Sequence, residues 1–282
     1  MFRKTDRRRL LGVAVAAVAA AGFAMAAPAP AQAAASGPGD KPGSVRDVCA
    51  APAKADQARC FAIARTDVAG RLGVVPQVTP NGYGPAALQS AYALPSAGAG
   101  NGQTVAIVDA FDNPNAESDL AVYRAQFGLA PCTTDNGCFR KLNQNGQPSP
   151  LPTPDAGWAA EIALDVQMVS AVCPNCHILL VEANTNFNTD LYTAVNEAVS
   201  LGAKFVSNSY GSPESAGETA SDASFNHPGV AITVSSGDSG TGAEYPATSR
   251  YVTAVGGTSL STASNARGWS EKAWTDAGSD PL

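Results

Sequence analysis

Four extended apolar segments, separated by helical patterns, constrain the fold of this chain more than any other feature. The segments are TVAIVDAF (104–111), HILLVEA (177–183), KFVSNSYG (204–211) and GVAITVSSGD (229–238). Helical patterns cover residues 115–129, 157–172 and 189–203. Strands that are apolar on both sides need cover on both faces, and strands that alternate with helices pair in parallel. The sequence therefore predicts an α/β fold, a parallel sheet flanked by helices.

The composition narrows the class of protein. The chain has 282 residues, 45% of them hydrophobic, which is enough for one large core or two modest ones. Its net charge is −6. A nucleic-acid-binding surface is normally strongly basic, so we do not expect nucleic acid as a partner.

Residues 1–33 have the three parts of a secretory signal peptide. A basic start, FRKTDRRRLL, precedes an uncharged apolar run at 10–27, and Ala31-Gln32-Ala33 offers a cleavage site. Arg7-Arg8 also fits the twin-arginine pattern, so both export routes stay open. A retained anchor is the alternative, because about 18 apolar residues can just span a bilayer. The small residues after the run favour cleavage, and we expect a secreted chain with no membrane contact thereafter.

Beyond the signal peptide, residues 34–81 are rich in alanine, proline and glycine and show little periodicity. The apolar and helical patterns begin at Gly82. We therefore predict an N-terminal extension over 34–81 and a folded domain over 82–282.

The six cysteines form three couples that are close in the sequence: Cys49 and Cys60, Cys132 and Cys138, Cys173 and Cys176. Export implies an oxidising compartment, and local pairing is the simplest of the 15 connectivities. The segment CPNCH (173–177) also has the spacing of c-type haem attachment, and two thiolates with one histidine resemble part of a zinc site. An axial histidine must project into a cavity, whereas this segment joins a predicted helix to a predicted strand, and no fourth zinc ligand is obvious nearby in the sequence. We predict a structural disulfide there, with a redox-active pair as the alternative.

The stretch SSGDSG (235–240) contains the Gly-Asp-Ser-Gly sequence that surrounds the nucleophile of chymotrypsin-like peptidases. That interpretation makes Ser239 the nucleophile and requires an all-β fold and a histidine base. The two histidines are His177, which opens an apolar segment, and His227, which lies in a predicted loop. We therefore do not expect Ser239 to be catalytic.

A pair of carboxylates gives the clearest chemical signal. Glu161 and Asp165 are four residues apart on a predicted helix, about 40° apart around its axis. Trp158, Met168 and Val172 share the same stripe. A solvated helix face is the simple interpretation, but the apolar company favours a partly buried pair. Paired carboxyls in an apolar setting have their pKa values pushed apart, as general acid–base catalysis needs.

Asp238 follows a buried strand and lies between Gly237 and Gly240, which permit tight turns. The carboxyl end of such a strand is where α/β enzymes place their chemistry. Asp238 has two interpretations. It is either a loop cap or a carboxylic acid that stays protonated and donates a hydrogen bond to an oxyanion.

In combination, these segments resemble the sedolisins, serine-carboxyl peptidases with a subtilisin-like fold. The ordered matches are residues 82–95, 160–183, 207–211, 234–240, 245–260 and 269–274. Carried over residue by residue, the resemblance implies that Glu161 is the general base, that Asp165 supports it and that Asp238 is the oxyanion-hole acid. It also implies a sedolisin-like peptidase domain over 82–282 that cleaves polypeptides at acid pH.

One further comparison and one departure from the sedolisin pattern bear on activity. Subtilisin itself is a weaker match, because Asp109 resembles its catalytic aspartate but no His-Gly-Thr motif is present. The sedolisin nucleophile, and the calcium site after it, lie further downstream than residues 245–260. Ser259 in GGTSL is the remaining candidate, yet a polar segment follows it rather than an apolar helix.

We therefore expect a subtilisin-like sheet that is incomplete at the C-terminus, with no nucleophilic serine, metal site or cofactor in this chain. We expect a monomer that is inactive alone. A non-catalytic secreted pseudopeptidase that binds peptides is the alternative.

Overall fold

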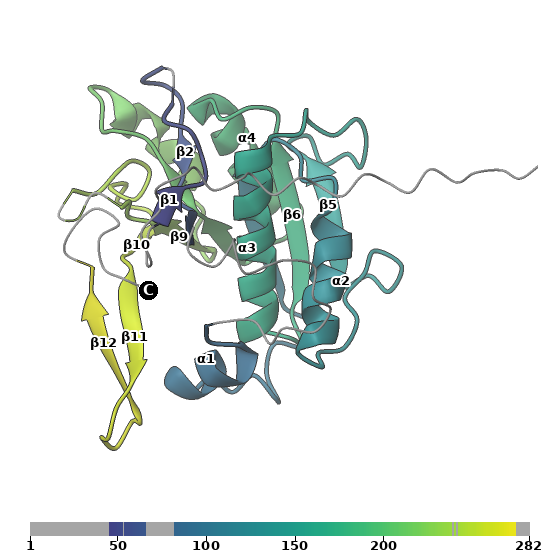
Figure 1. Ribbon diagram of the computed structural model, residues 1–282. Coiled ribbons are helices and arrows are strands. Elements are labelled where there is room, and N and C mark those ends of the chain that lie inside the picture. Colours follow the sequence, from purple (N-terminus) through teal and green to yellow (C-terminus); the bar gives the residue numbers. More distant parts are fainter. Residues whose placement is uncertain (1–44, 53, 66–81, 239, 241, 275–282) are drawn as a thin grey trace, which may run out of the picture. The chain divides into compact units, whose positions relative to one another are not determined.

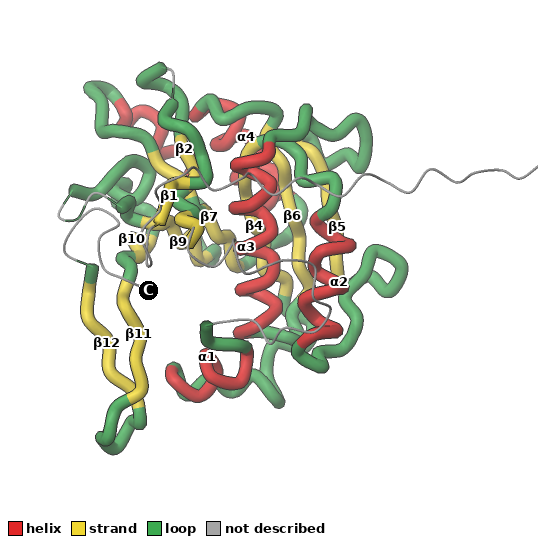
Figure 2. The backbone as a smooth tube through the Cα atoms, in the orientation of Figure 1, coloured by secondary structure: helices red, strands yellow, loops and turns green. Residues whose placement is uncertain are grey.

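Six parallel strands form the central sheet of this chain. The computed structural model describes residues 45–52, 54–65, 82–238, 240 and 242–274. The strands are β4 (Thr104–Ala110), β5 (Phe139–Asn143), β6 (His177–Ala183), β7 (Phe205–Asn208), β9 (Ala231–Ser235) and β10 (Thr253–Val255). They pair in the order β10–β9–β7–β4–β6–β5 (Figure 1 and Figure 2). The predicted α/β fold with a parallel sheet is confirmed.

Two details of the strands differ from the sequence pattern. β5 has the sequence FRKLN, and its two cationic side chains interrupt the apolar pattern. This strand was therefore not among the predicted apolar segments. The segment at 204–211 divides into β7 and the short strand β8 (Tyr210–Gly211), with Ser209 between them. β8 is outside the central sheet and pairs antiparallel with β2 (Arg59–Cys60).

Helices cover both faces of the sheet. Successive side chains of each strand point to opposite faces, so apolar strands need cover on both. The helices are α2 (Ala116–Gln126), α3 (Ala156–Val172) and α4 (Asn188–Ser200). One core joins β4 and β6 to α2 and α3 through Ile107, Ile178, Leu180, Leu120 and Ile162. The other core joins the same strands to α4 through Val108, Leu179, Val181, Leu191 and Val195. Figure 2 shows α2 and α3 together in front of the sheet.

Helix α3 carries the candidate carboxylates, and its first residues are fixed by a side-chain cap. The carboxylate of Asp155 accepts hydrogen bonds from the backbone N–H groups of Gly157 (2.9 Å) and Trp158 (3.0 Å). These are donors that a helix N-terminus otherwise leaves unsatisfied. The helix ends at Val172, and Cys173 and Pro174 lead into β6.

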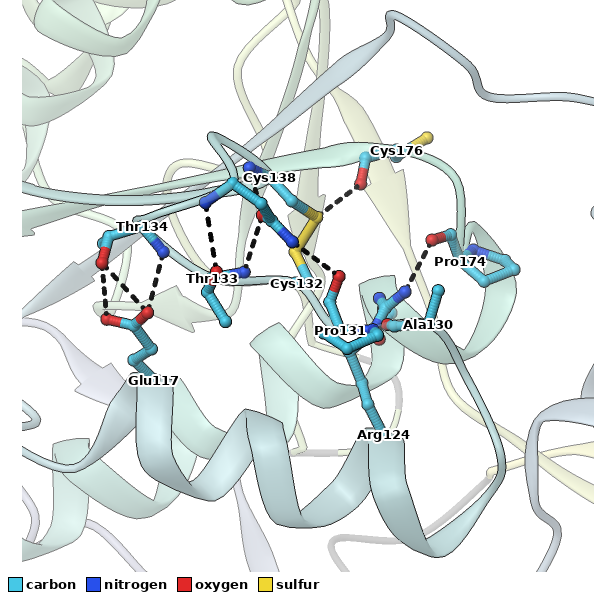
Figure 3. The surroundings of a disulfide bond; sticks show 12 residues. Glu117, Arg124, Ala130, Pro131, Cys132, Thr133, Thr134, Cys138, Pro174 and Cys176 are labelled. Atoms are coloured by element: carbon cyan, nitrogen blue, oxygen red, sulfur yellow. Dashed lines mark hydrogen bonds between the residues drawn. A yellow bond between two sulfur atoms is a disulfide. The ribbon is translucent and has the colours of Figure 1, made fainter.

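The three predicted disulfides are present: Cys49–Cys60, Cys132–Cys138 and Cys173–Cys176. The two cysteines of the CPNCH segment are thus bonded to each other. Figure 3 shows Cys132–Cys138 in the loop between α2 and β5. Nearby, Arg124 of α2 donates hydrogen bonds to the backbone oxygens of Ala130 and Pro174, tying this loop to the end of α3.

The described part of the predicted extension is folded against the domain. β1 (Val45–Asp47) pairs antiparallel with β3 (Ile63–Arg65). The disulfide Cys49–Cys60 closes the segment between them, and both of its cysteines are buried. Together with the β2–β8 pairing, these contacts hold the extension beside α3.

Replacing Cys49 and Cys60 by alanine is expected to destabilise this packing by about 2–4 kcal/mol. The disulfide restricts the unfolded chain, so the segment loses less conformational entropy on folding when the disulfide is present. Hydrogen exchange should become faster over 45–52 and 54–65, while the central sheet stays protected. The matched control replaces Cys132 and Cys138 and should leave exchange of the extension unchanged. Equal protection of the extension in both variants would contradict the prediction.

A hairpin follows the sheet. β11 (Thr258–Thr262) pairs antiparallel with β12 (Trp269–Ala273), and the hairpin contacts the end of α1 (Pro85–Ala91). The Tyr92 hydroxyl donates to Glu271 (2.6 Å), and Arg267 donates to the backbone oxygen of Ala91 (2.9 Å). A short 3-10 helix, η2 (Glu218–Phe225), packs beside α4.

The predicted signal peptide, residues 1–33, lies outside the described residues, as do residues 66–81 of the predicted extension. In the ranges that the structure describes, no helix combines the length and apolar character needed to cross a membrane.

Candidate active site

A cavity of about 300 Å³ brings the three candidate carboxylates together. Glu161 and Asp165 enter it from α3, and Asp238 enters from the loop after β9. The rest of its wall comes from α3 itself, from the ends of neighbouring strands and the loops after them, from the extension and from the residue after β12: Phe61, Leu164, Met168, Ser209, Ser235, Ser236, Gly237, Val255, Gly256, Gly257 and Trp274. The cavity therefore lies at the carboxyl ends of parallel strands, where α/β folds usually bind ligands.

Glu161 is held by the extension. Its side chain is buried, and its Oε2 accepts a hydrogen bond of 2.6 Å from the backbone N–H of Ala62. Burial, and secondly the negative charge of Asp165, raise the pKa of Glu161 to about 9. Backbone hydrogen bonds from Ala62 and Phe61 act in the opposite direction and lower it. In this arrangement Glu161 retains its proton at neutral pH.

Asp165 lies one helical turn further along α3. Burial raises its pKa to about 6, while hydrogen bonds with Ser209 and Glu161 lower it. Its Oδ2 is buried and has no hydrogen-bond partner among the described residues. The hydrogen bond between the two carboxyls places them in contact. Because the pKa of Asp165 is the lower of the two, Asp165 ionises before Glu161. Both pKa values lie above the ordinary range, and they differ from each other, as the pairing of the two carboxyls had predicted.

Asp238 follows a turn that requires glycine. Gly237 has φ +106°, a left-handed conformation that side chains disfavour, and a Cβ there would lie 3.3 Å from Glu244. Burial raises the pKa of Asp238, Arg59 lowers it, and the charges of Asp47 and Glu244 raise it. Arg59 also pairs with Glu244 (3.4 Å) and with Asp47 (3.9 Å). Its charge is thus shared among several carboxylates.

Two further buried acids lie behind the carboxylate pair. Asp109 of β4 and Glu182 of β6 are direct neighbours across the parallel strands. Both are fully buried, and neither oxygen of Asp109 has a hydrogen-bond partner in the described part of the chain. Burial, followed by the charges of Asp165 and Glu161, raises the pKa of Asp109 well above its ordinary range.

Glu182 was not among the predicted site residues. Its Oε1 accepts the N–H of Asn113 (3.1 Å) and lies 3.9 Å from Nζ of Lys141. Burial raises its pKa to about 8, although the Lys141 charge lowers it. A sequence signal existed, because Asp109 and Glu182 each interrupt an otherwise apolar strand.

The other residues that the motifs singled out lie apart from the carboxylates. Ser259 is on β11, and its hydroxyl accepts a hydrogen bond from the Trp274 indole (3.1 Å). His227 contacts Asn196 and the backbone of Ser224, each at 3.0 Å, and His177 opens β6. None of these three lines the cavity. Ser239 is outside the described residues.

Glu161 accepts hydrogen bonds from backbone N–H groups and, while it holds its proton, donates one to Asp165. Among the described residues, no serine hydroxyl donates to it. The described ranges also contain no cluster of three acidic, histidine or cysteine side chains arranged to hold a metal ion.

Replacing Ser209 by alanine is expected to raise the pKa of Asp165 above about 6, because the lost hydrogen bond favours the ionised carboxyl. A ¹³C titration of labelled aspartate side chains measures this directly. Ser235→Ala is the control, since the Ser235 hydroxyl donates to the backbone oxygen of Asn208 in the same cavity. An unchanged or lowered pKa in Ser209→Ala would refute the assigned contact.

This fold, a parallel sheet flanked by helices with its cavity at the carboxyl ends of the strands, is the subtilisin-like α/β class. The Subtilase family model matches residues 153–278. Kumamolisin from Bacillus sp. (strain MN-32) is 32% identical over 218 residues, which are 70% of this chain and 38% of that protein. The structure of Pseudomonas sedolisin, a serine-carboxyl proteinase complexed with two molecules of pseudo-iodotyrostatin, aligns with a TM-score of 0.54 at 26% identity.

The chain belongs to the sedolisin type of the subtilisin-like serine peptidase family. The structural alignment covers 68% of this chain and 58% of the sedolisin chain. The chain thus spans less than two thirds of each of these two relatives.

Proposed function

We propose that this chain belongs to a secreted serine-carboxyl endopeptidase that cleaves polypeptides at acid pH. The observation that carries the proposal is the gathering of Glu161, Asp165 and Asp238 around one cavity, although Asp238 is 73 residues from Asp165 in the sequence. Membership of a peptidase family supports the same chemistry.

The three carboxyls have distinct proposed roles. Glu161 accepts the proton of a serine hydroxyl as that oxygen attacks the peptide carbonyl carbon. Asp165 contacts Glu161, orients it and carries the proton of the pair while Glu161 is ionised. Asp238 stays protonated and donates a hydrogen bond to the carbonyl oxygen as negative charge develops there. The raised pKa of Asp238 supports this role, because a carboxylate cannot donate.

In the described structure, Glu161 is not in a state that can accept a proton from a serine. The N–H of Ala62 covers Oε2, and a pKa of about 9 leaves the carboxyl protonated across the acid range. We propose that Phe61 and Ala62 withdraw before catalysis. Water then reaches the pair, the burial that raises both pKa values decreases, and one proton is shared between Glu161 and Asp165 at acid pH.

We also propose that residues 1–282 alone do not hydrolyse peptides. The positions and hydrogen bonds of the described serines support this proposal. Ser259 lies on hairpin strand β11, and its hydroxyl accepts a hydrogen bond from Trp274. No described serine hydroxyl donates to Glu161. A secreted pseudopeptidase that binds peptides without cleaving them remains the second candidate, because the cavity exists without a placed nucleophile.

The proposed location, oligomeric state and cofactor requirement rest on the disulfides and on the sequence. Three disulfides and the signal-like N-terminus support an extracellular location. We propose a monomer with no cofactor bound by these residues. No described cluster fits a calcium ion, so no step of the mechanism uses one.

An assay at pH 3–5 with a denatured protein substrate tests the proposal. It compares residues 34–282 with the same chain extended through its downstream reading frame. We expect hydrolysis by the extended chain and none by residues 34–282. Activity of the short chain that disappears in Ser259→Ala would identify Ser259 as the nucleophile and refute the proposed inactivity. Activity in neither chain would favour the pseudopeptidase.

A further inference from the structure

A second cavity, of about 510 Å³, lies outside the candidate active site. It is bounded by the segment that leads into α1, by α2 and by α3. Its volume falls in the range of small-molecule and side-chain binding sites, about 300–1,000 Å³.

Four polar side chains border this cavity, and none has a partner in the described part of the chain. Asp119, Tyr123 and Gln126 come from α2, and Gln167 comes from α3. No hydrogen bond or ion pair joins their side chains to another described residue, and the hydroxyl oxygen of Tyr123 is buried. Buried polar groups are normally hydrogen-bonded, so the buried Tyr123 hydroxyl indicates a ligand that supplies its partner. Asp119 and Gln167 are partly buried and Gln126 is exposed, so the same ligand can reach these three side chains.

The walls of the cavity favour a positive charge. Tyr83, Tyr123 and Phe127 border it, and the rings of Tyr123 and Phe127 are 4.8 Å apart. Asp119 is the one charged residue of the described lining, which contains no lysine, arginine or histidine. A carboxylate beside aromatic rings attracts an ammonium or guanidinium group through an ion pair and cation–π contacts.

Met168 borders both cavities, so this one adjoins the candidate active site. Glu161 and Met168 are seven residues apart on α3, which corresponds to about 10 Å along a helix axis. An extended peptide covers that distance in about three residues.

We propose that this cavity binds the side chain of a lysine or arginine in the polypeptide substrate, about three residues from the bond that is cleaved. The inference rests on the proposed function, because it takes the peptide to run from Glu161 towards Met168. The ammonium or guanidinium group pairs with Asp119, its stem packs on Phe127 and Tyr83, and the amides of Gln126 and Gln167 accept its remaining N–H groups.

Fluorescence anisotropy with residues 34–282 tests the cavity without requiring cleavage. The probe is a labelled, otherwise uncharged nonapeptide with one central arginine, compared with the same peptide carrying citrulline, which has a similar shape but no charge. We expect the arginine peptide to bind about tenfold more tightly. Asp119→Asn should remove this difference. Asp135→Asn, at an exposed acid outside the cavity, should keep it.

The outcomes separate this inference from the proposed function. An arginine preference that Asp119→Asn abolishes supports the cavity, whether or not any form of the protein cleaves peptides. Hydrolysis by the extended chain with equal binding of the two peptides would overturn the inference and leave the proposed function standing. A preference that persists in Asp119→Asn, or no binding of either peptide, also overturns it.

Discussion

Replacing Glu161 by glutamine is expected to lower kcat/KM for peptide hydrolysis by about 10⁴-fold or more, in whichever form of the protein is active in the assay above. Loss of the base from a serine peptidase triad costs up to about 10⁶-fold, because the nucleophile and its base act as one unit. Glutamine keeps the size of the side chain and can still accept the N–H of Ala62. It cannot accept a proton, so the substitution isolates the proposed chemical role.

The control for this prediction is Glu214→Gln, at an exposed glutamate in the loop after β8. Its kcat/KM should match that of the unsubstituted chain. Asp238→Ala should cost about 10²–10³-fold, as expected for one lost oxyanion donor. Full activity in Glu161→Gln would exclude Glu161 as the base, whatever the other variants show.

The free energy of unfolding is expected to fall by several kcal/mol as the pH rises from about 5 to 9. Four buried acids have raised pKa values in the folded chain: about 6 for Asp165, about 8 for Glu182, about 9 for Glu161, and well above the ordinary range for Asp109. Unfolded carboxyls titrate near pH 4. Between these limits the folded state binds more protons, so stability falls with rising pH.

This stability is fully present below about pH 4 and is lost as the pH rises through the folded pKa values. Glu271 acts in the opposite sense, because hydrogen bonds from Tyr92 and Arg267 lower its pKa to about 2. Its contribution changes below pH 5 and leaves the measured window unaffected.

Urea unfolding at pH 5, 7 and 9, with the disulfides intact, measures the effect. Glu182→Gln should flatten the pH dependence, since glutamine can accept the N–H of Asn113 and cannot ionise. Glu214→Gln serves again as the control and should leave the slope unchanged. Stability that is constant or increases from pH 5 to 9 would show that these acids are ionised in the folded chain at neutral pH.

Much of the fold and part of the site follow from local sequence. Segments 104–111 and 177–183 are apolar over their whole length, which marks them as strands covered on both faces. The spacing of Glu161 and Asp165 places them on one side of a helix wherever that helix packs. The disulfides are local in the same sense, because their cysteines are at most 11 residues apart.

Contacts between distant segments were decided by the tertiary structure. The Ala62 N–H reaches Glu161 across 99 residues, and nothing in the extension, which is rich in alanine, proline and glycine, predicts that its backbone covers the candidate base. Asp109 and Glu182 become neighbours through the register of β4 against β6. Hydrophobic pattern identifies a strand, but a strand apolar on both faces carries little information about which residues of its neighbour it will face. The sequence therefore determined which side chains share an element. Packing of the elements determined which carboxyls share a low-dielectric interior, and that proximity sets their pKa values and the chemistry available to the site.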